Sequence, residues 1–131
     1  MVDERTSEGR SAEGRGLSVF VTGAGGYIGR QLIAAMAEDR EHFDRIVAGD
    51  IRLPAVEKRL QGVHYVESDI RDPRLSDSFT DFGINLVVHL AAVVTPPKGA
   101  DRRLLYSIDV LGTENVLQAC LAAGVERIII T

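Results

Sequence analysis

Hydrophobic and polar positions alternate in two distinct ways along the chain from Leu17 onward. Short apolar runs that are rich in β-branched residues and bounded by turn residues predict strands over 17–21, 45–49, 63–67, 85–91 and 127–131. Between these runs, apolar residues recur at helical spacing, which predicts helices over 27–40 and 101–123. A shorter helix is predicted over 73–82, with an Asp-Pro pair at its start. Segment 51–62 has no pattern clear enough to assign.

Strands that alternate with helices favour parallel pairing through right-handed crossovers, with helices on both faces of one sheet. The predicted fold class is therefore α/β, a doubly wound parallel sheet of the Rossmann type with five strands. In such sheets ligands bind beyond the carboxyl ends of the strands, where the strand order reverses. We expect functional residues just after Val21, Gly49, Glu67 and Leu90.

Composition limits the chain to one domain and excludes two classes of partner. The 131 residues, 45% hydrophobic and 26% charged, suffice for one core, whereas residues 1–16 contain few large apolar groups and are predicted to be a disordered tail before a domain at 17–131. A net charge of −4 gives no general basic field for nucleic acid, and no stretch is suited to a membrane span. We therefore expect a cytoplasmic protein, in which the single cysteine, Cys120, is a buried structural thiol.

A glycine-rich loop joins the first predicted strand to the first helix. Gly23, Gly26 and Gly29 stand three residues apart, which suits a tight turn, a backbone free of Cβ atoms and a helix start whose N–H groups face a pyrophosphate. Arg30 stands where a P-loop requires lysine, so that phosphate-binding loop is excluded. The competing interpretation is a glycine-rich turn without a ligand, and the acid described next argues against it.

Asp50 follows Gly29 by 21 residues and ends the second predicted strand. A carboxylate at this place can accept hydrogen bonds from both hydroxyls of an adenosine ribose and repels a 2′-phosphate, which favours NAD over NADP. Arg52 works in the opposite direction, because a nearby guanidinium can accommodate the extra phosphate.

Five sequence features in order carry a family resemblance. "VTGAGGYIG", Asp50, "ESDIRD" (67–72), "VVHLAA" (87–92) and "IDVLGTENVLQAC" (108–120) together resemble the extended short-chain dehydrogenase/reductases, the NAD-dependent epimerase/dehydratase family. The resemblance extends from residue 17 to 131 and implies the NAD-binding portion, with the C-terminal part of the family fold absent.

The resemblance also implies a role for each cofactor-binding residue. Gly23, Gly26 and Gly29 would hold the pyrophosphate, with backbone N–H groups from Tyr27 and Ile28. Asp69 and Ile70 would flank the adenine, with Asp69 accepting from its exocyclic amine. The residues passing under the ribose toward the nicotinamide would be Leu90, Ala91 and Ala92.

Three further residues have interpretations other than catalysis. His89 lies among apolar neighbours in a predicted strand and is expected to be a core histidine hydrogen-bonded by the backbone. Asp109 stands where the family usually has Asn; because an ionised Asp only accepts, we expect a looser contact there. Gly112 is expected to let its helix approach the sheet or a neighbour closely.

Family catalysis uses a Tyr-x-x-x-Lys pair assisted by Ser or Thr. The only lysines, Lys58 and Lys98, are preceded four residues earlier by Pro54 and Val94, so no catalytic residue and no metal ligand is assigned, and the chain alone is predicted to be inactive. We also expect homo-oligomers through helix 101–123, which is apolar on more than one side. Strand 127–131 is expected to be an exposed edge of the sheet.

The leading functional hypothesis is the NAD(H)-binding domain of an epimerase/dehydratase-type oxidoreductase, with a small-molecule substrate bound by a longer parent protein. The resemblance implies hydride transfer at a hydroxyl carbon of a nucleotide sugar. The alternatives are a 3β-hydroxysteroid dehydrogenase-like fragment, a non-catalytic dinucleotide-binding sensor or scaffold, and a subunit completed by a second polypeptide.

Overall fold

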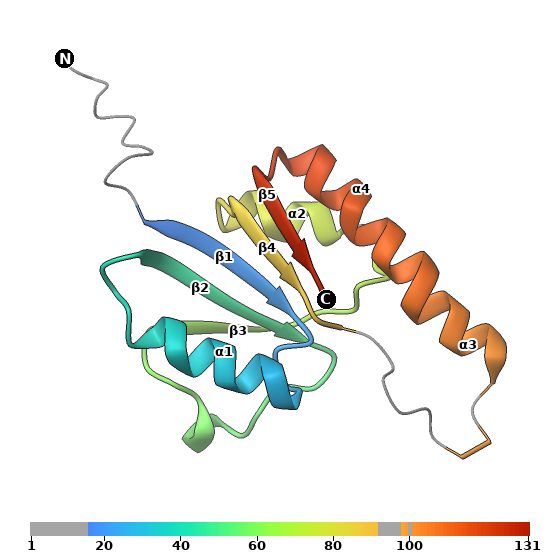
Figure 1. Cartoon of the computed structure of the whole chain (residues 1–131), viewed down its shortest axis with the longest axis horizontal. Helices are drawn as coiled ribbons and strands as arrows, with labels where there is room; N and C mark the ends of the chain where they lie inside the picture. Colours follow the sequence, from blue (N-terminus) through green and yellow to red (C-terminus); the bar gives the residue numbers. More distant parts are fainter. Residues whose placement is uncertain (1–15, 92–97, 100) are drawn as a thin grey trace.

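The computed structural model describes residues 16–91, 98–99 and 101–131, which form one parallel sheet with helices on both faces (Figure 1). The strands are β1 (Leu17–Thr22), β2 (Phe43–Asp50), β3 (Val63–Glu67), β4 (Leu86–His89) and β5 (Arg127–Ile130). Their order across the sheet is β3-β2-β1-β4-β5, and every pairing is parallel. The Rossmann-type fold is confirmed, and the strand order reverses between β1 and β4.

The helices follow the predicted sequence of elements. They are α1 (Tyr27–Ala37), α2 (Leu75–Asp81), α3 (Arg102–Tyr106), a π-helix η3 (Ser107–Gly112) and α4 (Thr113–Ala123), with a 3₁₀ turn η2 (Val56–Lys58) in the segment left unassigned. The predicted helix 101–123 is thus helical from 102 onward, with a π-helical segment in its middle. Within the described residues, no helix combines the length and the apolar character needed to cross a bilayer.

Several predicted boundaries were wrong, and β2 begins at Phe43 rather than at residue 45. Helix α1 ends three residues early, at Ala37. Helix α2 begins at Leu75 rather than at Pro73, because the Asp72 carboxylate accepts the Arg74 N–H at 2.8 Å in a turn before the helix. Strand β4 ends at His89 rather than at residue 91, because the next two N–H groups donate to the Thr22 hydroxyl.

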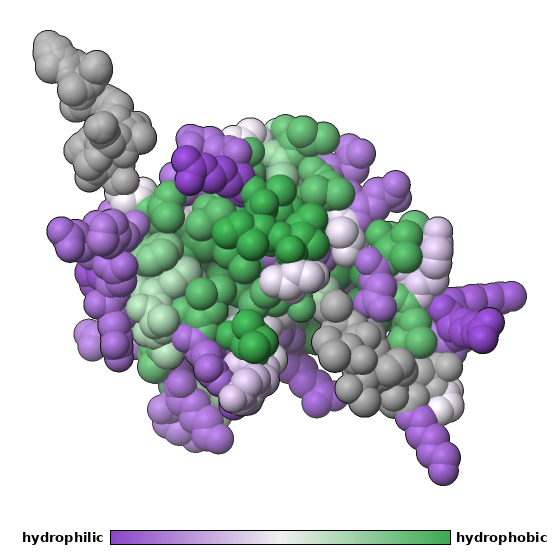
Figure 2. All heavy atoms as spheres, viewed as in Figure 1, coloured by the Kyte–Doolittle hydropathy of each residue, from purple (hydrophilic) through white to green (hydrophobic). Residues whose placement is uncertain are grey.

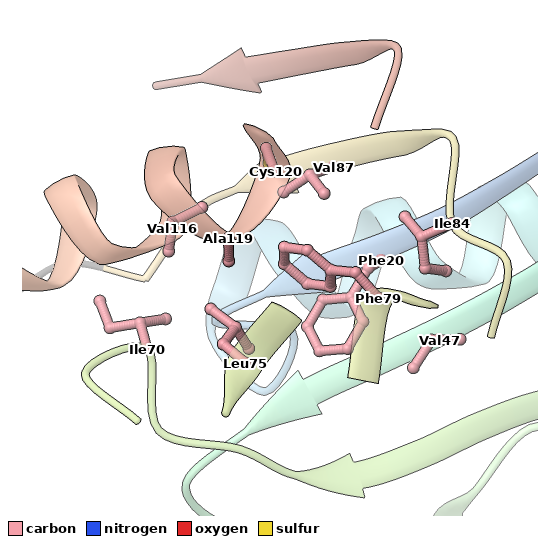
Figure 3. Packing of buried hydrophobic residues seen from close by; sticks show 10 residues of the cluster. All are labelled: Phe20, Val47, Ile70, Leu75, Phe79, Ile84, Val87, Val116, Ala119 and Cys120. Atoms are coloured by element: carbon pink, nitrogen blue, oxygen red, sulfur yellow. The ribbon is translucent and has the colours of Figure 1, made fainter. Parts of the chain in front are cut away.

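Successive side chains of β1 point to opposite faces of the sheet, and each face packs into its own hydrophobic core. Val19 and Val21 face a core that includes Ile33 and Met36 of α1. Phe20 faces the other core, where its ring meets Phe79 of α2 edge-on at 4.9 Å between centroids (Figure 3). Strand β1 therefore has apolar cover on both faces, which places its carboxyl end in the middle of the molecule.

Helix α4 packs on the second core through its small and β-branched residues. Val116 and Cys120 are buried there, and burial raises the pKa of the Cys120 thiol to about 11, so the cysteine is structural, as predicted. Gly112 lets the helix approach the sheet closely, because a Cβ at this position would lie 2.6 Å from Cδ1 of Ile70. This packing role was also predicted and is confirmed.

Several apolar residues remain outside both cores. Ile28, Leu104 and Leu111 are large apolar residues of helical segments, and each is exposed. Strand β5 pairs only with β4, and Ile129 and Ile130 are about half exposed. Figure 2 shows hydrophobic side chains gathered over the part of the sheet that contains β4 and β5. The edge position of β5 agrees with the prediction.

We expect Phe20→Ala to lower the free energy of unfolding by about 3–5 kcal/mol, because it removes a fully buried ring and leaves a cavity beside Phe79. Urea unfolding of the variant and the wild type measures the difference. Val56→Ala is the control: this side chain is 74% exposed and lies outside segment 101–123, so its loss is expected to change the free energy by less than about 0.5 kcal/mol. Equal costs for the two variants would contradict the described core.

Candidate functional site

A cavity of about 570 Å³ opens at the carboxyl ends of the strands, where the strand order reverses. Ten of the predicted cofactor-binding residues line it: Gly23, Gly26, Tyr27, Ile28, Gly29, Asp50, Asp69, Ile70, Leu90 and Ala91. Ala92, the eleventh, lies outside the described residues. The fold thus gathers residues from four separate loops around one space, while the role of each in binding a cofactor stays a prediction.

Two of the three predicted glycines in the first loop are required by contacts inside the protein. Gly23 has φ +69°, and a Cβ on it would lie 2.7 Å from the backbone nitrogen of Ala91. A Cβ on Gly29 would lie 2.5 Å from the carbonyl oxygen of Gly23. Gly26 differs from both, because an added Cβ would contact only the Gly23 oxygen, at 3.5 Å. Gly26 is therefore the position where the missing side chain leaves room in the cavity.

The N-terminus of α1 opens on this cavity without a side-chain cap. Gly26 is the N-cap residue, no side chain accepts from the first N–H groups, and the first turn contains no acidic residue. Such a helix start carries a partial positive charge and unpaired donors, which suit a phosphate or pyrophosphate. The residues present therefore fit the diphosphate of a dinucleotide.

Asp50 connects the glycine loop to the end of β2. Its Oδ2 accepts the Gly25 N–H at 2.8 Å, and its Oδ1 accepts the Arg52 N–H at 3.3 Å. A carboxylate offers about four lone-pair directions, so these two bonds leave acceptor capacity for ribose hydroxyls. The side chain thus fits the predicted ribose role and also fixes the loop in the absence of a ligand.

Asp69 has a partner that the sequence analysis did not identify. Arg71 donates to both carboxylate oxygens of Asp69, at 3.0 and 2.9 Å, and its remaining NH1 donates to Ser107 Oγ of η3 at 3.0 Å. The side-chain hydrogen bonds from Arg71 hold the pKa of Asp69 below its ordinary value. Asp69 is therefore ionised and an acceptor, which its predicted contact with an adenine amine requires.

A buried hydroxyl at the end of β1 fixes the loop that follows β4. Thr22 Oγ1 accepts the N–H groups of Leu90 and Ala91 at 3.0 and 3.1 Å, and it lies 2.7 Å from Nδ1 of His89. Because the two N–H groups occupy both lone pairs of the Thr22 hydroxyl oxygen, the hydroxyl donates its own proton to Nδ1 of His89. Nδ1 is then an acceptor, and the proton of the neutral imidazole lies on Nε2. Nε2 then donates to Thr113 Oγ1 of α4, at 2.9 Å.

These hydrogen bonds correct the expectation that the backbone provides the partners of His89. The residue is a buried core histidine, as predicted, but its partners are two hydroxyls rather than the backbone. Burial lowers its pKa, which keeps the imidazole neutral near pH 7. His89 is absent from the cavity lining, and it acts as a link between the sheet and α4.

Asn115 of α4 fixes the loop after β3, which forms one side of the cavity. Its amide nitrogen donates to the carbonyl oxygens of Ile70 and Asp72, at 2.7 and 2.8 Å. These bonds occupy both amide protons and fix the loop that carries Asp69. Over the described residues, no group of three or more His, Cys, Asp or Glu side chains is arranged to hold a metal ion.

A parallel sheet in this order, with a glycine loop and an uncapped helix at the reversal point, defines a Rossmann-type nucleotide-binding domain. The chain belongs to the NAD-dependent epimerase/dehydratase family, whose model matches residues 19–131. It corresponds to the N-terminal, NAD-binding portion of the family's proteins.

Three known proteins similar to the chain are considerably longer than it is. Short-chain dehydrogenase/reductase family 42E member 1 of Xenopus laevis is 34% identical over 116 residues, which cover 87% of this chain and 28% of that protein. L-arabinose 1-dehydrogenase (NAD(P)(+)) of Haloferax volcanii is 33% identical over 112 residues, 85% of this chain and 39% of that one. The structure of MoeE5 in complex with UDP-glucuronic acid and NAD is 30% identical, with a TM-score of 0.71, over 86% of this chain and 36% of that one.

We predict that His89 makes the protein less stable in mild acid. Because its pKa is lower in the folded state than the ordinary 6.5, the unfolded state binds the proton more readily. Stability should therefore fall as the pH drops below about 6.5. Urea unfolding between about pH 5 and 7.5 measures this, and His89→Asn should flatten the dependence.

His42 provides a control of opposite sign. The exposed His42 ring forms a hydrogen bond with Asp39, and this bond raises the pKa of His42. The contribution of His42 to stability is therefore present in acid and is lost as the pH rises through that pKa. Removing it with His42→Asn should make the loss of stability in acid steeper. A pH dependence unchanged by His89→Asn would count against the neutral tautomer described above.

Proposed function

We propose that this chain is the NAD(H)-binding portion of an epimerase/dehydratase-type oxidoreductase whose reaction transfers a hydride at a hydroxyl carbon of a nucleotide sugar. The observation that carries the proposal is the single cavity shared by the uncapped start of α1, the glycine loop and Asp50. In a dinucleotide the diphosphate and the ribose hydroxyls are close enough together for the start of α1 to bind the diphosphate while Asp50 binds the hydroxyls.

The chain's own residues would bind and orient the cofactor. Backbone N–H groups at Tyr27 and Ile28 would take the pyrophosphate, and Asp50 would accept from the ribose hydroxyls. Leu90 and Ala91, fixed by the Thr22 hydroxyl, would form the floor toward the nicotinamide half. Bound NAD would supply the hydride-accepting nicotinamide, which no side chain can replace.

The nucleotide-sugar substrate class rests on similarity. MoeE5, whose structure contains UDP-glucuronic acid and NAD, is 30% identical to the chain over the aligned part. The chain spans 36% of MoeE5, so the substrate of a longer protein remains part of this proposal. The sequence contains no Tyr-x-x-x-Lys, and we therefore expect binding of the cofactor without turnover by this chain alone.

Titration of the purified chain with NAD by isothermal calorimetry tests the proposal, with Gly26→Val as the decisive variant. A valine there would project into the space assigned to the pyrophosphate and should weaken NAD binding by at least about tenfold. The φ of Gly26 is −75°, and an added Cβ would contact only one backbone atom, so the Gly26→Val variant should fold; because valine is a poorer N-cap residue than glycine, we expect its melting temperature to fall by about 4–8 °C. Absence of NAD binding by the wild type, or equal binding by a folded Gly26→Val variant, would refute the cofactor site.

We also propose that copies of the chain associate through segment 101–123. Its described surface exposes six large apolar side chains: Leu104, Tyr106, Val110, Leu111, Leu117 and Leu121. Light scattering should give a dimer mass for the wild type and a monomer mass for Leu111→Glu or Leu121→Glu, because a charge in an apolar interface is costly. A monomeric wild type at all concentrations would contradict this assignment.

A further inference from the structure

The loop that follows β3 is bonded to the π-helix η3 through the side chain of Arg71. Both carboxylate oxygens of Asp69 accept from this guanidinium, and its NH1 donates to Ser107 Oγ at 3.0 Å. The Ser107 hydroxyl in turn donates to the carbonyl oxygen of Leu104 in α3, at 3.1 Å. Arg71 is therefore held at three of its nitrogens between two elements, unlike an isolated surface ion pair.

The π-helix brings both of its ends to this loop. Ser107 begins η3 and bonds to Arg71, while Gly112 ends it beside Ile70. A Cβ on Gly112 would lie 2.6 Å from Cδ1 of Ile70 and 3.5 Å from the Ser107 carbonyl oxygen. Residues five apart are joined by the hydrogen bonds of a π-helix, whereas in an α-helix they lie roughly 140° apart around the axis. An α-helix with Gly112 against Ile70 would therefore turn Ser107 away from Arg71.

Within the described part of the chain, these bonds leave Asp69 with one open acceptor position. Its Oδ1 accepts the backbone N–H and the Nε of Arg71, at 2.9 and 3.0 Å, and its Oδ2 accepts NH2 at 2.9 Å. A carboxylate offers about four lone-pair directions, so one remains, on Oδ2. Because Asp69 lines the cavity at the strand ends, a ligand there meets one fixed acceptor, and no donor, from this side chain.

We propose that Arg71, anchored on Ser107, positions the open acceptor of Asp69 and thereby makes the site select a purine with a 6-amino group over one with a 6-oxo group. The inference rests on the proposed function, since it takes the ligand to be a dinucleotide whose purine lies beside Asp69. A 6-amino group donates to a fixed carboxylate oxygen, whereas a 6-oxo group faces it with a second acceptor, and two facing acceptors repel. Arg71 acts through Asp69, so it is a positioning residue that needs no contact with the ligand.

Calorimetric titration with NAD and with nicotinamide hypoxanthine dinucleotide, in which a 6-oxo group replaces the amine, tests this selectivity. We expect the wild type to bind NAD at least about tenfold more tightly than the hypoxanthine dinucleotide. In Arg71→Gln the Asp69 carboxylate is free to turn toward the ring N1–H of hypoxanthine, so the ratio of the two Kd values should fall below about threefold. Ser107→Ala should lower the ratio by less, because the bonds between Arg71 and Asp69 remain.

Arg74→Gln is the matched control. Arg74 pairs with Asp72 two residues before it, as Arg71 pairs with Asp69, but neither Arg74 nor Asp72 belongs to the described lining of the cavity, so the Kd ratio should equal that of the wild type. Both arginines are exposed, and each variant should keep the fold.

The outcomes separate selectivity from binding. If the wild type bound neither dinucleotide, the proposed function would be refuted and this inference with it. If the wild type bound NAD with a ratio below about threefold, or if Arg71→Gln weakened both dinucleotides equally and left the ratio unchanged, only the positioning role of Arg71 would be overturned.

Discussion

The carboxyl end of β1 packs directly against the backbone of the chain after β4, and the geometry of the other loops depends on this contact. Gly23 lies so near the chain after β4 that a Cβ would stand 2.7 Å from Ala91 N, and the adjoining Thr22 hydroxyl accepts the N–H groups of Leu90 and Ala91. The two strand ends are thereby joined by a close backbone contact and by the short Thr22 side chain. A backbone surface remains, which is what a flat, polar cofactor requires.

Helix α4 stabilises the loops around the cavity through hydrogen bonds made by two of its side chains. Thr113 accepts from His89, whose other ring nitrogen receives the Thr22 proton, and Asn115 donates to the loop after β3. Together with the bond from Gly25 to Asp50, these contacts fix three of the loops that border the cavity before any ligand is present. A ligand that enters a fixed site loses less affinity to the ordering of loops, so these supporting residues contribute to binding although they need not touch it.

The sequence predicted the fold and the cavity-lining residues well because both depend on local patterns. Strand and helix periodicity, and glycines three residues apart, are visible within a dozen positions. The hydrogen-bond partners of His89 were missed because they are distant in the chain: Thr22 and His89 are 67 residues apart, and Thr113 follows His89 by 24. The late start of α2 has a different cause. From the sequence, a helix could begin directly after Asp72 or a few residues later, and the turn in which Arg74 donates to the Asp72 carboxylate delays its start to Leu75.

Asp50 shows why a cofactor preference is difficult to assign from one carboxylate. Its carboxylate holds the glycine loop through the Gly25 N–H, so any substitution of Asp50 would alter that loop together with the ribose contact proposed for it. A change in affinity for either dinucleotide would then have two causes.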